Sequence, residues 1–69
     1  MDLDIRRAVL HNVHGNNREE LQDVIVDAIQ KREEKMLPGL GVLMEVLWNQ
    51  SDAPFRNELL TRLEQGVHA

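Results

Sequence analysis

The chain has 69 residues, a hydrophobic fraction of 42%, a charged fraction of 29% and a formal net charge of −4. These values indicate one small globular domain and exclude both a disordered tail and a general attraction to nucleic acid or anionic membranes. Cysteine is absent, so we expect no disulfide and no thiolate metal site. Since no secretion signal and no apolar run of about 18 residues is present, we expect a soluble intracellular protein.

The first two predicted helices cover about residues 3–13 and 18–33. Gly15 provides a stop after the first helix, because glycine readily adopts the left-handed backbone that ends a helix. Asn17 precedes the second helix and lies three residues before Glu20, which is the spacing of a capping box. Apolar residues of the second helix follow helical spacing closely, and this outweighs the β-branched residues among them.

A third helix is predicted over about residues 38–49, after a break. Leu37 precedes a proline, and a residue in that position disfavours helical backbone. We therefore expect the break between about Lys35 and Leu37, and the sequence leaves open whether residues 33–37 are helix or loop. The proline itself suits the first turn of the third helix.

The third helix is apolar around most of its circumference. Between Leu40 and Trp48 the apolar side chains cover an arc of about 240°, which must be covered on more than one side. Gly39 and Gly41 weaken the helix at its start, and we expect a neighbouring backbone to approach them closely in compensation.

The fourth helix is predicted over about residues 53–65, with cap residues before it and Gly66 at its end. Helices joined by short loops, without any strand signal, indicate an all-α fold. We expect a single domain over residues 1–69, a small bundle of four short helices around the apolar third helix.

The helical spacing predicts a core formed by one side of each helix. Truncation of Leu43 or Leu47 to alanine should then cost about 2–5 kcal/mol. The residues expected to be buried are Leu21, Val24, Ile25, Ala28, Ile29, Leu40, Leu43, Leu47, Phe55, Leu59 and Leu63.

We expect the uncovered part of the third helix to pair with a second copy of the chain. Two-fold pairing is the commonest oligomer symmetry, and a real interface should bury more than about 1,000 Å² in total. The candidate interface residues are Val42, Met44, Val46 and Trp48.

No arrangement of residues in the sequence indicates catalysis or cofactor binding. His11 and His14 lie one turn apart, but no further ligand accompanies them to complete a metal site. Glu33, Glu34 and Glu45 lack partners suited to acid–base or nucleophilic chemistry. We therefore expect no catalytic residue, no metal and no cofactor.

One long run at the centre of the chain resembles a known family. It covers Glu33–Leu43 and is followed by Glu45 and Trp48. This run resembles the minor small acid-soluble spore protein I family of endospore-forming bacilli, and the likeness covers almost the whole chain. Family members usually carry an aromatic residue where Met44 stands and a Ser-Gly pair at positions 31–32.

The resemblance implies production in the developing forespore and residence in the spore core. It implies no catalytic activity and provides no site residues, because the biochemical role of the family is not established. DNA coating belongs to the major acid-soluble spore proteins, which carry a protease motif of the Glu-Phe-Ala-Ser type that this chain lacks.

The sequence is compatible with three functions. The leading one is a non-enzymatic spore-core protein that acts through protein contacts, with itself or with an unidentified protein partner. The second is association with nucleic acid, motivated by the arginines of the first two helices, although interleaved glutamates favour a mixed solvated surface. The third is a small enzyme or ligand-binding protein, which would need a convergent polar pocket.

Overall fold

The computed structural model describes the backbone of residues 2–69 and the side chains from Ile5 onward. It contains the helices α1 (Asp2–Val13), α2 (Arg18–Lys31), α3 (Leu37–Gln50) and α4 (Ala53–Val67), with a 3₁₀ turn, η1 (Glu34–Met36), between α2 and α3. Residues 2–69 contain no strand. The predicted all-α fold class with four short helices is therefore confirmed.

Side-chain caps fix the starts of α2 and α4. The Asn17 side chain accepts the backbone N–H of Glu20 at 2.8 Å, and the Glu20 carboxylate accepts the N–H of Asn17 at 2.9 Å. The predicted capping box is confirmed. Asp52 caps α4 by accepting the N–H of Phe55 at 3.1 Å. The predicted stop after α1 is also confirmed, since Gly15 has a left-handed φ of 82°.

The junction between α2 and α3 differs from the prediction. α2 ends at Lys31, two residues earlier than expected, because Arg32 adopts a left-handed φ of 54°. Leu37 is helical, with φ −62° and ψ −41°, although it precedes a proline. The expected break at residues 35–37 is therefore wrong. The chain leaves helical geometry at Arg32 instead, and η1 then runs directly into α3.

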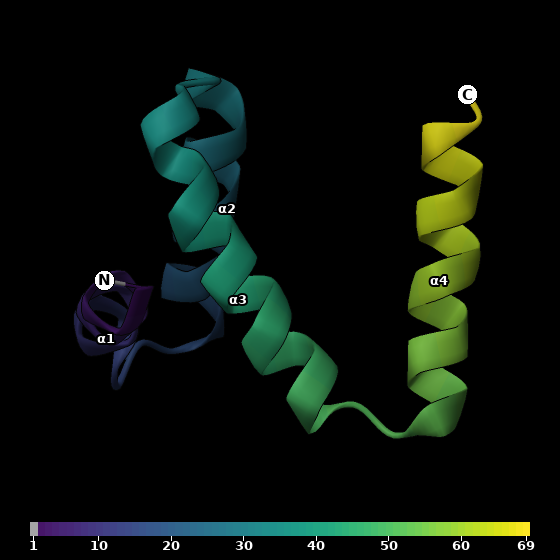
Figure 1. The fold of residues 1–69 in the computed structure, drawn as a ribbon, viewed down its shortest axis with the longest axis horizontal. Coiled ribbons are helices and arrows are strands. Elements are labelled where there is room, and N and C mark those ends of the chain that lie inside the picture. Colours follow the sequence, from purple (N-terminus) through teal and green to yellow (C-terminus); the bar gives the residue numbers. More distant parts are fainter. Residues whose placement is uncertain (1) are drawn as a thin grey trace.

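α1 and α2 pack against α3, whereas α4 leaves α3 at the connection Ser51–Asp52 and stands apart from it (Figure 1). The two buried hydrophobic residues of the described side chains, Ala28 of α2 and Val42 of α3, belong to the packed part. α4 also continues through Gly66 to Val67, so the expected end of the fourth helix at this glycine is wrong.

The single chain is more open than a compact domain of its size. Its radius of gyration is 13.1 Å, whereas about 11 Å is typical of a compact domain of this length. Its accessible surface is 6111 Å², whereas a compact monomer of this mass exposes roughly 4,500 Å². The splayed arrangement thus leaves about 1,600 Å² of additional surface in contact with solvent.

The predicted core is consequently wrong for most of its members in the single chain. Ala28 is buried, and Leu21, Leu40, Leu43 and Leu59 are half-buried. Each helix has the apolar side that its spacing indicates, but α4 finds no neighbour to cover that side. The predicted core residues that are exposed are Val24, Ile25, Ile29, Leu47, Phe55 and Leu63.

The glycines at the start of α3 do not permit a close backbone approach. A Cβ added at Gly39 or at Gly41 would meet no atom within 4 Å beyond its own helix. The expected compensation for these glycines is therefore wrong, and the space beside Gly41 is open.

Candidate interaction surface

α3 carries an apolar strip that the helices packed against it leave uncovered. α1 meets α3 beside Val42 and Glu45, with Gly41 at the edge of the hollow between the two helices, and both α1 and α2 lie near Leu43. Four residues of α3 share a different side of the helix, because neighbouring members of the set are separated by four, three and four positions. These residues, called the α3 stripe below, are all exposed: Leu37, Gly41, Met44 and Trp48.

Arg56 holds the corner between α3 and α4. Its guanidinium carbon lies 4.9 Å from the centroid of the Trp48 ring, which is a cation–π distance. Its Nε also donates a hydrogen bond to the Trp48 carbonyl oxygen at 3.0 Å. The Ser51 hydroxyl donates to the carbonyl of Leu47 at the same corner. Because Ser51 and Asp52 both have extended backbone, α4 leaves α3 in a defined direction.

α4 carries an apolar strip with the same spacing as the α3 stripe. Starting from Arg56, steps of four, three and four positions reach three exposed apolar residues on one side of the helix. These residues, called the α4 stripe below, are Leu60, Leu63 and Val67. The spacing of α4 indicates all three, although the predicted core includes Leu63 and neither Leu60 nor Val67.

The four predicted interface residues do not lie on one face of α3. Met44 and Trp48 belong to the α3 stripe and are 49% and 37% exposed. Val46 is also exposed, but the helical period turns it almost to the opposite side from these two. Val42 is only 7% exposed in the single chain. Val42 is therefore packed inside the fold and offers little surface for contact with another chain.

An ion pair joins α1 to α3 beside the α3 stripe. Arg6 contacts both carboxylate oxygens of Glu45, at 2.7 Å through Nε and at 2.9 Å through a terminal guanidinium nitrogen. The hydrogen bond from Arg6, with its charge in support, lowers the pKa of Glu45 below the usual glutamate value. Since both side chains are nearly half exposed to water, the pair orients α1 on α3 more than it stabilises the fold.

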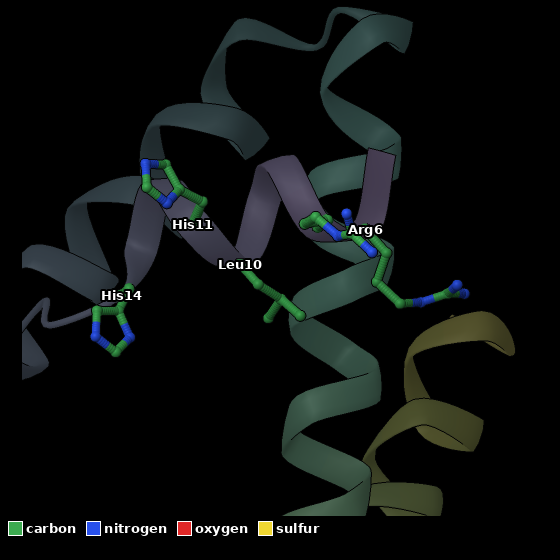
Figure 2. Close-up of a pocket in the computed structure, with 5 residues that line it drawn as sticks. Arg6, Leu10, His11 and His14 are labelled. Carbon is green, nitrogen blue, oxygen red and sulfur yellow. The ribbon is translucent and has the colours of Figure 1, made fainter. Parts of the chain in front are cut away.

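A shallow hollow of about 430 Å³, lined by Leu10 and by basic side chains, lies on the exposed side of α1 (Figure 2). Its lining includes Arg6, Arg7, His11 and His14. The rings of His11 and His14 do not point toward one another in Figure 2. Among the side chains that the structure describes, no group of three His, Cys, Asp or Glu residues is placed to hold a metal ion.

The described part of the chain also has no helix long and apolar enough to cross a membrane. Its prominent surface features are the two apolar stripes. The structure therefore defines the chain as a small all-α protein with solvent-exposed apolar helix faces.

Comparison with known proteins gives the family. Residues 3–67 match the family described as small, acid-soluble spore protein I. Relatives with that name from Bacillus licheniformis and Bacillus subtilis are each 58% identical to the chain, over 100% and 97% of it and over 99% and 94% of their own lengths. A relative of the same name from Bacillus cereus is 57% identical over 97% of both chains. The chain belongs to this family of spore proteins, and the resemblance seen in the sequence is confirmed. No solved structure matches the chain.

Proposed function

We propose that the chain is a non-enzymatic protein of the spore core, made in the forespore during sporulation, which acts through protein contacts. Its first contact is with a second copy of itself, through the apolar surface of α3. Membership in a family of spore proteins supports the setting. The action through contacts is carried by one observation: a single chain leaves the α3 stripe exposed although the stripe contains no charged residue.

Equilibrium sedimentation at micromolar concentration tests the self-association. We expect a mass of two chains for the unmodified protein, since apolar surface of this extent is rarely left in water by a monomer. Met44→Glu places a charge in the α3 stripe and should give a mass of one chain. Asn49→Glu, on the polar side of the same helix, is the matched control and should leave the mass at two chains.

A monomeric mass for the unmodified protein contradicts the proposal. Fluorescence of Trp48, the single tryptophan, adds a second measurement on the same sample. Shielded emission from a monomer would show that the chain closes over its own α3, and no pairing surface would then remain.

A fluorescent fusion produced from the native promoter tests the location in sporulating cells. We expect fluorescence that fills the forespore after its engulfment and remains inside the spore when the coat is stripped. A peripheral ring that disappears with the coat would contradict residence in the core.

A second candidate function is association with nucleic acid, favoured by the hollow that Arg6, Arg7, His11 and His14 line on α1. The net charge of −4 opposes it, and so does the engagement of Arg6 with Glu45. Phosphate contacts are strongest at low salt. A gel mobility shift of duplex DNA at low salt that is lost in Arg7→Ala would support this function, and no shift at any protein concentration would remove it.

A further inference from the structure

We propose that two copies pair by exchanging α4, so that the α4 stripe of each chain packs antiparallel on the α3 stripe of the other. This inference rests on the self-association proposed above and names the surface and the occupant that produce it. Three observations carry it: the matching register of the two stripes, the geometry of the corner, and the amount of apolar surface left open.

The register of the two stripes is complementary. Moving away from the corner, the α3 stripe and the α4 stripe both advance by four, three and four residues. Antiparallel helices with this alternation meet residue against residue along a seam, as in left-handed helix pairs. Gly41 then faces Leu63, and the open space beside Gly41 receives the larger side chain. The pairs between chains are Met44 with Leu60, Gly41 with Leu63, and Leu37 with Val67.

The corner keeps α4 away from its own α3. Within one chain only the first contact of the seam is made, where Arg56 lies over Trp48. Beyond that contact the two helices diverge (Figure 1). The hydrogen bonds from Arg56 to Trp48 and from Ser51 to Leu47 brace the corner. A short connection of this kind favours exchange between copies over closure within one chain.

The apolar surface left open is of the size that a stable dimer needs. The large residues of the two stripes are between 37% exposed, at Trp48, and 70% exposed, at Val67. At roughly 200 Å² for each large apolar side chain, this amounts to about 640 Å² per chain and about 1,300 Å² for a pair. A specific interface buries more than about 1,000 Å².

The seam also brings no charge into the apolar contact between chains. Glu45 is the one charged residue of α3, and its carboxylate is held by Arg6 on the side that faces α1. At the corner end of the seam the one charged residue is Arg56, and Trp48 of the same chain already covers its guanidinium. The contact can therefore form without leaving an unpaired charge buried.

Disulfide trapping tests the exchange directly, because the chain has no cysteine of its own. Under mild oxidation, a chain carrying both Met44→Cys and Leu60→Cys should form a covalent dimer. A mixture of chains that carry only Met44→Cys with chains that carry only Leu60→Cys should form the mixed covalent dimer. The matched control is Met44→Cys with Thr61→Cys, one position further on the polar side of α4, and it should remain uncrosslinked.

The possible outcomes separate this inference from the proposed function. A covalent monomer from the double variant would mean that α4 closes on its own chain, and it overturns the exchange. Rapid dimerisation of Met44→Cys alone, in preference to the mixed dimer, would mean that α3 pairs with α3. That result overturns the exchange and leaves self-association intact. Absence of any crosslink overturns the exchange, and the sedimentation mass of the unmodified chain then shows whether self-association fails as well.

Discussion

The two halves of α3 differ in how much of their apolar surface the other helices cover. Its N-terminal half is packed by α1 and α2 on one side, where Val42 is buried together with Ala28 of α2, and the opposite side, at Leu37, stays exposed. Its C-terminal half carries residues as apolar as those of the first half, yet Leu47 and Trp48 remain exposed. The helix is continuous through both halves, so the difference lies in the neighbours and not in the local structure.

This contrast separates helix formation from burial. Caps and propensity suffice to predict α4, whose start is held by Asp52. Burial of the apolar side of α4 needs a second apolar surface. α3 of the same chain offers such a surface, but the corner at Ser51 and Arg56 directs α4 away from it. A single chain therefore has one region in which the helices are packed and a second region whose apolar side chains remain exposed.

The largest effect is expected from a charge placed in the packed half of α3. Val42→Asp buries a carboxylate with no partner and should cost roughly 3 kcal/mol or more, which removes most of the stability of so small a domain. Val46→Asp, one turn further along, places the same charge at an exposed position and should cost less than about 1 kcal/mol. Thermal unfolding followed by circular dichroism measures both, and equal losses would break the contrast between the two halves.

A smaller effect separates two leucines of the same helix. Leu43 is half-buried against α1 and α2, so Leu43→Ala should cost about 2 kcal/mol. Leu47 is 40% exposed, and Leu47→Ala should cost less than about 1 kcal/mol in the dilute monomer, well below the sequence-based expectation. Urea unfolding at submicromolar concentration gives the two values. A loss for Leu47→Ala that matches Leu43→Ala would show that the single chain already covers the second half.

The junction before α3 offers a gain in stability. Arg32 has a left-handed φ of 54°, a conformation that costs a residue with a Cβ about 1–2 kcal/mol and glycine little. Arg32→Gly should therefore raise the free energy of unfolding by about 0.5–1 kcal/mol. Lys31→Gly, one position earlier and still inside α2, should lower it by about 1 kcal/mol. Denaturant midpoints of the two variants should move in opposite directions, and a decrease in both would mean that the helix does not end at Lys31.

The smallest effect concerns the ion pair that ties α1 to α3. Arg6 lowers the pKa of Glu45 in the folded chain, so folding favours the ionised carboxylate. Its contribution is fully present above the usual glutamate pKa and is lost as the pH falls through the lowered pKa of the folded state. The difference in stability between the unmodified chain and Glu45→Gln should therefore be small at pH 7 and shrink below about pH 4.5. A difference that grows on acidification would contradict the assigned direction.

Local signals allowed much of the fold to be predicted. The Asn17–Glu20 capping box and the stop at Gly15 depend on neighbouring residues alone, and both are confirmed. The left-handed Arg32 was missed because arginine gives no local signal for that conformation. For the candidate surface, Met44 and Trp48 could be identified from the apolar excess of α3. The spacing also places Leu60 and Val67 on one side of α4, but the surface that covers this side could not be predicted, because the periodicity looks the same whether that surface is in the same chain or in another.

The presence of four helices, the cap of α2 and the apolar side of each helix follow from local sequence, because they depend on contacts within a few residues along the chain. Family membership also follows from the sequence, through a long run of side chains centred on the start of α3. Which apolar sides are covered depends instead on how the helices are arranged in space. That outcome depends on the direction in which the chain leaves each helix, and two extended residues with an arginine over a tryptophan set that direction at the end of α3.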